Sequence, residues 1–384
     1  MITFDYPVGY HDFHKTKIIN YQMNRWYSMG YTRKEDMIDA SNKIRKLEDW
    51  KEEMVKQANK ALSENRLMNA TFYYRAAEFF THPNDPDKIT LYDTFINMFY
   101  NDLFADEPIE RFEIPYDDGY LPAMRLSAND AIKKGTIVIH GGFDSFMEEL
   151  YSMATYFSHL NYEVILFEGP GQGKALKKYS FPLNYKWEEP TKAILDYFDL
   201  DNVSLLGVSM GGWLCFRAAA FEPRINRVIA HSIAYDYMKI PPPIVEKFAL
   251  WLFKYPKLMD WMADLKMKVM PQEKWGTDNL MYITKTDTPL EGGMALLEFN
   301  AEHLKSELVT QDVLILTGTE DHFIPLKMHN LQVQALENAN SITERIFTRK
   351  EHAHNHCQVG NFGLALKVIA DWLEELESNN SNLK

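Results

Sequence analysis

The chain has 384 residues, of which 46% are hydrophobic and 25% are charged, and its formal net charge is −13. This length can bury a large core, and two cysteines, Cys215 and Cys357, are too few for a disulfide framework. The excess of acid argues against nucleic acid or an anionic membrane as the main partner. Because no segment resembles a signal peptide or a membrane span, we expect a cytoplasmic protein.

Residues 1–110 predict an N-terminal helical domain that covers part of the rest of the chain. Residues 34–62 carry apolar side chains at helical spacing, and residues 89–103 predict a further helix after a proline-rich turn. The aromatic residues between 72 and 80 favour a helix–helix core, although some of them could instead line a substrate pocket.

Residues 111–231 and 306–384 predict an α/β domain. After a hairpin at residues 112–126, short apolar strands alternate with helices, which is typical of a mostly parallel sheet covered on both faces. We expect these strands at residues 136–140, 163–167, 203–206, 227–230, 313–316 and 342–347.

Residues 232–305 interrupt this alternation and predict an inserted helical lid. Three consecutive prolines, residues 241–243, cannot lie inside a helix, and a stretch rich in Trp, Phe and Met follows them. Such side chains favour an apolar or aromatic ligand. We expect Tyr235, Trp251 and Trp261 to line its pocket.

The strongest chemical signal is Gly-Val-Ser-Met-Gly at residues 207–211, between a predicted strand and a predicted helix. This context is typical of a nucleophile elbow, in which a tight turn with small flanking residues pushes the serine hydroxyl out above the sheet. We therefore predict Ser209 as a nucleophile. Cys357 has no such turn, and Cys215 falls within a predicted helix.

A serine nucleophile needs a base and an acid that orients the base. When the serine lies in such an elbow, the acid and then the histidine follow it along the chain. Asp321, 112 residues after Ser209, ends the loop that follows a strand, and Glu320 is its local rival. Three histidines then precede the last helix: His352, His354 and His356. Spacing barely separates them as the base. Their alternation could also bind a divalent metal, but no partner cluster is apparent.

Two glycine-rich loops accompany these residues. His-Gly-Gly-Phe at residues 140–143 follows a strand, where an oxyanion loop belongs, so we expect the backbone N–H groups of Phe143 and Met210 to bind an oxyanion. Residues 168–174 suggest a phosphate loop, but Glu168 and Ala175 stand where that motif requires Gly and Ser or Thr. We expect this second loop to pack beside the elbow.

With these motifs, the chain resembles the α/β-hydrolase superfamily over residues 110–378. Within it, the chain is similar to the bacterial group with an N-terminal helical domain, which includes 2,6-dihydropseudooxynicotine hydrolase, the fermentation-respiration switch protein and acylaminoacyl-peptidase-like proteins. The motifs that carry this likeness are residues 167–173, residues 141–149, the His356-Cys357 pair and residues 73–80. The resemblance implies a Ser209–Asp321–His356 triad, no cofactor and often a homodimer, and from the residues alone we expect no metal.

The function expected from these observations is a serine hydrolase that cleaves an ester or amide of a small to medium acyl substrate or short peptide. The alternatives are a carbon–carbon bond hydrolase of the same fold, an acylaminoacyl- or dipeptidyl-peptidase-like enzyme, and a non-catalytic ligand-binding protein. Asp236 is a candidate pocket acid without an assigned role.

Overall fold

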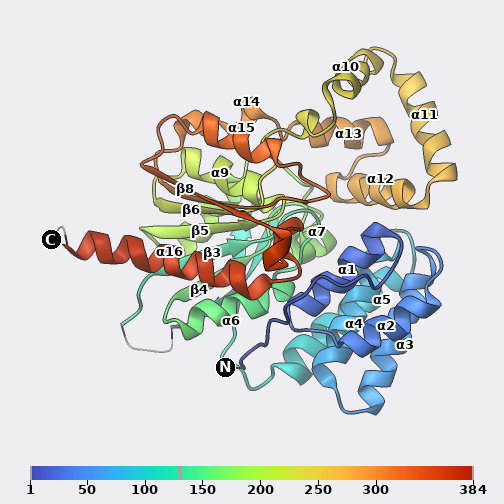
Figure 1. The fold of residues 1–384 in the computed structure, drawn as a ribbon, viewed down its shortest axis with the longest axis horizontal. Coiled ribbons are helices and arrows are strands. Elements are labelled where there is room, and N and C mark those ends of the chain that lie inside the picture. Colours follow the sequence, from blue (N-terminus) through green and yellow to red (C-terminus); the bar gives the residue numbers. More distant parts are fainter. Residues whose placement is uncertain (1, 129–131, 383–384) are drawn as a thin grey trace.

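The computed structural model describes residues 2–128 and 132–382, which form a central sheet between layers of helices (Figure 1). The sheet has eight strands in the order β1-β2-β4-β3-β5-β6-β7-β8. Its strands are β1 (Glu110–Tyr116), β2 (Gly119–Leu126), β3 (Thr136–His140), β4 (Glu163–Phe167), β5 (Val203–Val208), β6 (Ile225–His231), β7 (Asp312–Gly318) and β8 (Ser341–Phe347).

Strands β3 to β8 are parallel, whereas β1 and β2 form an antiparallel hairpin that joins the sheet through β4. The register pairs His140 with Gly207 and Gly207 with Ala230, so the ends of β3, β5 and β6 stand level. The loops that carry the candidate catalytic residues therefore leave the same edge of the sheet.

Helices cover both faces of the sheet because alternate strand residues point to opposite sides. Ile137 and Ile139 are buried with α6 (Tyr151–His159) and α16 (Phe362–Asn382). Val138 between them is buried on the other face, in the cluster that includes side chains of the helices there. The helices of this second layer are α7 (Gly173–Tyr179), α8 (Glu188–Tyr197), α9 (Gly211–Phe221) and α15 (Lys327–Ala335).

The N-terminal region consists of helices and short turns from Lys17 to Leu103. Its helices are α1 (Lys17–Ser28), α2 (Lys34–Lys43), α3 (Asp49–Ser63), α4 (Leu67–Phe80) and α5 (Asp87–Asn97), which continues into a wider turn, η1 (Met98–Leu103). The stretch with helical spacing over residues 34–62 forms two helices, α2 and α3, because the Asp49 carboxylate accepts the N–H groups of Arg45 and Lys46 and holds a turn there.

This helical region shares one core with the face of the sheet that α6 covers. The Tyr31 hydroxyl accepts the N–H of Ser152 at 2.9 Å, and the rings of Phe4 and Tyr151 meet edge to face with centroids 6.0 Å apart. Phe72, which is fully buried, belongs to the same core. Aromatic side chains of the N-terminal helices therefore serve mainly as core.

Helices α10 to α14 occupy the stretch between β6 and β7, and α10 and α11 project from the body of the molecule (Figure 1). No helix within the described ranges combines the length and apolarity required to cross a membrane. The bounds of these helices are α10 (Pro243–Leu252), α11 (Pro256–Val269), α12 (Pro271–Thr284), α13 (Pro289–Leu297) and α14 (Ala301–Leu304).

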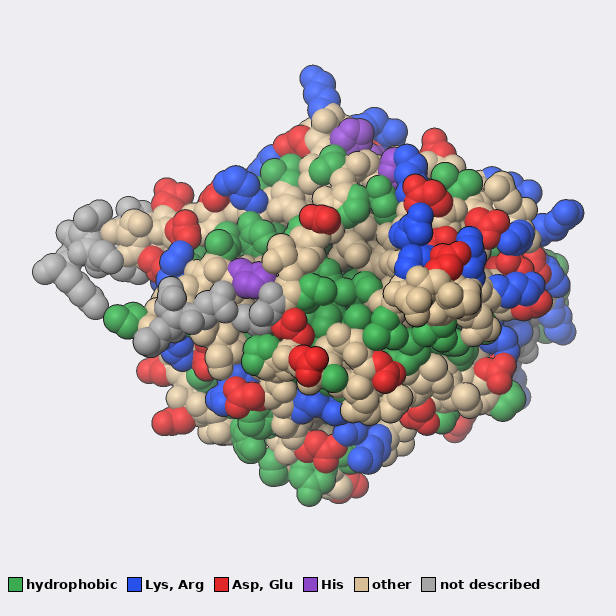
Figure 2. All heavy atoms as spheres, turned by 90° about the horizontal axis from the view of Figure 1, so that it is seen from below, with side chains coloured by type: hydrophobic (Ala, Val, Ile, Leu, Met, Phe, Trp, Pro, Cys, Tyr) green, Lys and Arg blue, Asp and Glu red, His purple; other side chains and the backbone are tan. Residues whose placement is uncertain are grey.

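Charged side chains of both signs are interspersed on the face of the molecule shown in Figure 2. Exposed acids also pair with lysine or arginine, as Glu52 does with Lys56 at 2.7 Å. The net charge of −13 thus does not gather into a single acidic surface on this face.

Candidate active site

Ser209 lies at a sharp turn between β5 and α9, with φ at 63°. Its N–H donates to the carbonyl of His231 at 2.9 Å, and its own carbonyl accepts the N–H of Gly212 at 2.9 Å. A side chain at Gly207 would collide with the Gly211 carbonyl, and one at Gly212 would collide with the Ser232 carbonyl, just after β6. These contacts fix the strained turn that presents the hydroxyl at the sheet edge.

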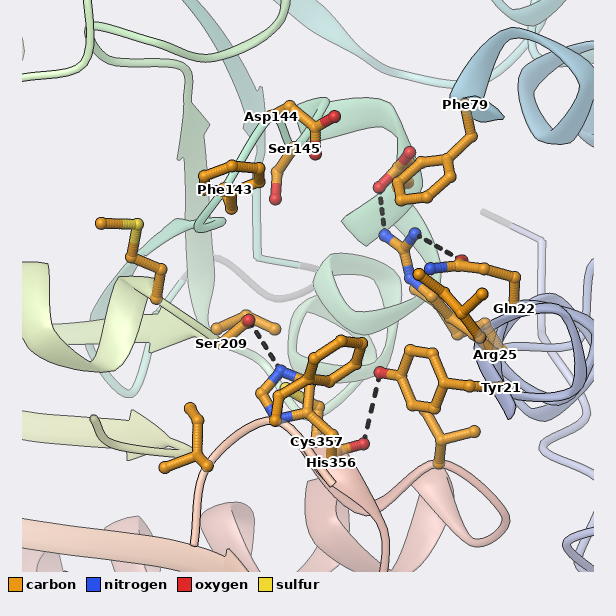
Figure 3. Close-up of a pocket in the computed structure, with 18 of the residues that line it drawn as sticks. Tyr21, Gln22, Arg25, Phe79, Phe143, Asp144, Ser145, Ser209, His356 and Cys357 are labelled. Carbon is orange, nitrogen blue, oxygen red and sulfur yellow. Dashed lines mark hydrogen bonds and ion pairs between the residues drawn. The ribbon is translucent and has the colours of Figure 1, made fainter. Parts of the chain in front are cut away.

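His356 and Asp321 complete a hydrogen-bonded chain with this serine, and Figure 3 shows its link between Ser209 and His356. Nε2 of His356 is 2.7 Å from Oγ of Ser209, and Nδ1 is 2.6 Å from Oδ2 of Asp321. The other carboxylate oxygen, Oδ1, accepts the N–H groups of Phe323 and Ile324, each at 2.9 Å. Both ring nitrogens of His356 therefore have a partner, and the Asp321 carboxylate is itself held by two backbone N–H groups.

The electrostatics of the pair favour charge on both partners. Burial alone would lower the pKa of His356, but the Asp321 carboxylate raises it above the ordinary histidine value. Burial would likewise raise the pKa of Asp321, but the imidazole and two backbone N–H groups hold it below the usual range. Asp321 thus stays ionised and stabilises a proton on His356.

The loop after β3 lies against the elbow. An added Cβ at Gly142 would be 2.6 Å from the backbone nitrogen of Met210, so the loop needs glycine for this close approach. Among the hydrogen bonds of the described residues, neither Phe143 nor Met210 uses its N–H as a donor. Both residues line the pocket beside Ser209. Two N–H groups that are available near a nucleophile can donate hydrogen bonds to an oxygen on which negative charge develops.

The second glycine-rich loop supports the first. Nε2 of Gln172 donates to the carbonyls of Gly141 and Gly142 at 2.9 and 3.0 Å. Glu168 accepts the backbone N–H groups of Met147 and Lys174, at 3.1 and 2.6 Å. This loop therefore holds the backbone of the β3 loop rather than a phosphate.

Ser209 opens into a cavity of about 320 Å³. Most of its wall is apolar, and it draws on the N-terminal helices, the sheet edge and the lid. The apolar lining residues are Ile18, Met29, Phe79, Phe143, Leu150, Val208, Met210, Ile240, Trp275, Phe323, Ile324, Val359 and Phe362.

Helix α1 supplies polar groups to this cavity that the sequence did not single out. Gln22 and Arg25 lie across the pocket from Ser209 in Figure 3. Tyr21 donates a long hydrogen bond of 3.4 Å to the carbonyl of His356. These residues follow no motif, and their spacing of three and four positions on one helix face is the only sequence signal that could have grouped them.

The expected pocket residues of the lid require a correction. Trp251 and Trp261 leave 47% and 61% of their surface exposed, because α10 and α11 project from the body. Tyr235 packs among the side chains beside β6 and does not line the cavity either. The inserted residues 232–305 reach the cavity instead through Tyr237, Ile240 and Trp275, the last from α12.

Of the three candidate histidines, the structure brings His356 to the serine. His354 is buried near Tyr10, with ring centroids 5.8 Å apart, and Asn355 is its polar neighbour. His352 has φ at 60° and ends the short turn before this segment. Across the residues that the structure describes, no three His, Cys, Asp or Glu side chains gather as a metal site requires.

Residues 137–352 match the alpha/beta hydrolase fold family, which is more than half of the chain. The chain therefore belongs to this family, and it is a hydrolytic enzyme. The match covers the sheet from β3 onward, the elbow and the lid.

Among curated relatives, the chain is 26% identical over 347 residues to "Hydrolase acrC" of Aspergillus aculeatus, covering 80% of each chain. It is 30% identical over 249 residues to "20-hydroxy-prefusarin hydrolase FUS2" of Gibberella moniliformis, covering 58% of this chain and 59% of that one. A solved structure of 2,6-dihydroxy-pseudo-oxynicotine hydrolase matches 91% of this chain and 94% of its own with a TM-score of 0.65. At 19% identity, this likeness shows a common fold alone, and its coverage of the chain extends into the N-terminal helical region.

Proposed function

We propose that the protein is a serine hydrolase that cleaves an ester or amide of a small to medium, largely apolar or aromatic substrate. The observation that carries this proposal is the hydrogen-bonded chain from Ser209 through His356 to Asp321, with distances of 2.7 and 2.6 Å. A serine hydroxyl is weakly nucleophilic at neutral pH and requires such a base.

In this mechanism Ser209 attacks the substrate carbonyl carbon while Nε2 of His356 takes the hydroxyl proton. Asp321 orients the imidazole and stabilises its protonated form. The carbonyl oxygen becomes an oxyanion, which the N–H groups of Phe143 and Met210 bind. His356 then gives its proton to the leaving group as the carbonyl re-forms, and the acyl-enzyme is hydrolysed by a water that His356 deprotonates.

The cavity supports the substrate class. A volume of about 320 Å³ fits a small to medium ligand, and its wall is built mainly from Phe, Ile, Leu, Met, Trp and Val side chains. Met29 and Met210 can adjust to irregular shapes because their side chains are unbranched.

The test is covalent labelling with a fluorophosphonate probe, with the labelled residue located by peptide mass. We expect labelling at Ser209, lost in Ser209→Ala and reduced by orders of magnitude in His356→Ala. His354→Ala is a matched control, because that ring lies beside Tyr10 and Asn355 whereas His356 bonds the serine, and it should label like the wild type. A folded wild-type protein that is not labelled, or is labelled elsewhere, would refute the proposal.

A second assay separates ester or amide cleavage from carbon–carbon cleavage. The wild type is given an aryl ester and a β-diketone, and products are identified by mass spectrometry. We expect turnover of the aryl ester, abolished in Ser209→Ala. Turnover of the diketone alone would assign the protein to the carbon–carbon hydrolases.

A further inference from the structure

The far end of the cavity carries a charged group that the proposed reaction does not use. Arg25 of α1 lies opposite Ser209, and the exposed 17% of its side chain borders the cavity (Figure 3). Its guanidinium pairs with Glu149 and donates to Oε1 of Gln22 at 3.3 Å. Arginine has five N–H groups, and the hydrogen bonds of the described residues use two of them.

Glu149 does not neutralise Arg25 by itself. This carboxylate is fully buried and is shared, because its other oxygen pairs with Arg75. Arg75 also pairs with Glu78, which in turn contacts Lys88 at 3.0 Å and Lys177 at 2.8 Å. The network thus runs from the cavity wall into the interface between α4, α5 and α7.

The network holds four cations and two carboxylates, which are Arg25, Arg75, Lys88, Lys177, Glu78 and Glu149. Asp144 is a third acid close enough to act on Arg75 and Lys88. Even with this acid ionised, four positive and three negative charges leave an excess of one.

The pKa shifts of Asp144 and Lys88 leave this excess of positive charge in place at pH 7. Burial raises the pKa of Asp144, whose Oδ2 accepts Nδ2 of Asn279 at 2.7 Å, and this weakens its contribution of negative charge. Burial lowers the pKa of Lys88 to about 8, which still leaves most of it protonated at pH 7. Uncompensated buried charge is costly, and a ligand of opposite charge removes that cost.

We infer that Arg25 and Gln22 form a subsite for an anionic oxygen group of the substrate, a carboxylate or an enolate, at the end remote from the bond that is cleaved. The inference rests on the proposed function, because it places this group in the cavity that Ser209 opens into. The substrate is then a molecule with an apolar body, a reactive carbonyl near Ser209 and a negative charge near α1. A guanidinium is suited to this role because its planar N–H groups match a pair of oxygens.

Two matched pairs of esters test the subsite, since the anionic end could lie on the acyl side or the leaving-group side. The first pair is the mono-4-nitrophenyl ester of suberate and the same ester with its free carboxylate replaced by a carboxamide. The second pair is 4-octanoyloxybenzoate and 4-octanoyloxybenzamide. The measured quantity is the ratio of kcat/KM for the carboxylate over kcat/KM for the amide within each pair.

We expect the wild type to prefer the carboxylate in at least one pair by about 10- to 100-fold, the range for hydrogen bonds to a charged group. Arg25→Gln should bring this ratio close to one, and Arg25→Lys should retain part of it. Arg33→Gln removes an exposed arginine of the same helical region and should keep the wild-type ratio. Because each ratio is taken within one protein, altered folding or altered chemistry in a variant cancels.

A wild-type ratio of one or below in both pairs would overturn the inference, whatever the variants do. An unchanged ratio in folded Arg25→Gln would overturn it as well, and would leave Arg25 a purely structural partner of Glu149. If Ser209 hydrolyses the two esters that carry a carboxamide in place of the carboxylate, the proposed function is upheld in either case. Failure of every ester together with absence of fluorophosphonate labelling would instead refute the proposed function itself.

Discussion

Replacing Asp321 by asparagine tests the proposed mechanism most directly, because the structure fixes how the new side chain must lie. Oδ1 of Asp321 accepts two backbone N–H groups at 2.9 Å, from Phe323 and Ile324. An asparagine in the same place keeps its carbonyl oxygen there, so its NH₂ group faces Nδ1 of His356. The imidazole must then accept at Nδ1 and carry its proton on Nε2, which leaves no lone pair for the hydroxyl of Ser209.

The expected loss in kcat for Asp321→Asn is about 10⁴-fold, which corresponds to about 5.4 kcal/mol of activation free energy. The assay is hydrolysis of a neutral 4-nitrophenyl ester between pH 5 and 9, with thermal melting to establish that the variant is folded. Glu320→Gln is the matched control, since this neighbouring acid pairs with Arg349 at the surface, and its activity should stay within about twofold. A folded Asp321→Asn variant that keeps more than a tenth of the wild-type kcat would refute the assigned tautomer and base.

Three further predictions address pH, stability and the oxyanion loop. Wild-type kcat/KM should increase with pH, and its midpoint should lie above the ordinary histidine value of about 6.5, because Asp321 raises the pKa of His356, which must be unprotonated to act as a base. Glu78→Gln should lower the melting temperature at pH 7 by about 4–6 °C, since losing a buried ionic partner costs about 3–5 kcal/mol and a chain of 384 residues unfolds with an entropy of about 0.8 kcal/mol/K. Gly142→Ala should lower kcat by about 10²–10³-fold, because the added Cβ would lie 2.6 Å from the nitrogen of Met210 and block an oxyanion donor.

The sign of the stability effect with pH distinguishes the ionic role of Glu78 from a packing role. Burial would raise the pKa of this carboxyl, but Lys177, Lys88 and Arg75 hold it well below its usual value. Its contribution is therefore present above the unfolded pKa of about 4.3 and is lost as the pH falls through the depressed folded value. The melting difference should thus shrink in strong acid, and a difference that does not change with pH would contradict the prediction. Glu52→Gln, at an exposed position, serves as its control.

The other two predictions also have clear contrary outcomes. A pH profile that is flat between 5 and 9 would argue against an imidazole base. Gly293→Ala is the control for the loop variant, because a Cβ at that helical glycine has nothing within 4 Å, and its activity should remain at the wild-type level. Equal activity of Gly142→Ala and Gly293→Ala would exclude the assigned oxyanion loop.

Sequence reasoning predicted the α/β architecture well where the local pattern is strong. The strands at residues 136–140 and 163–167 have the predicted bounds, since short, mainly apolar runs that end close to glycines mark buried parallel strands. Helices α7 and α15 escaped prediction, because Lys-Ala-Leu-Lys-Lys-Tyr and Lys-Met-His-Asn-Leu-Gln carry little apolar periodicity. Their helical form depends on packing against the sheet.

The residues near the elbow and those on α1 differ in how far the sequence could reveal them. Ser209 sits in a motif whose glycines are dictated by the local turn, so the motif is visible in five residues. Arg25 meets Glu149 across 124 positions, and no local pattern encodes such a contact. The expectation that Trp251 and Trp261 line the pocket failed for a related reason, since composition does not reveal which way a helix points.

The first segment of the chain is held in place by almost the last. Gly9 donates its N–H to the carbonyl of Gly360 at 2.7 Å, and Gly360 donates to the hydroxyl of Ser28 at 3.1 Å. During synthesis, α1 leaves the ribosome long before the segment that anchors it, at a rate of about 5–20 residues per second. Helix α1, which forms one wall of the cavity, is therefore synthesised some tens of seconds before the segment that anchors it. Hydrolytic activity should therefore arise only after the segment around Gly360 has left the ribosome and has bound the segment around Gly9.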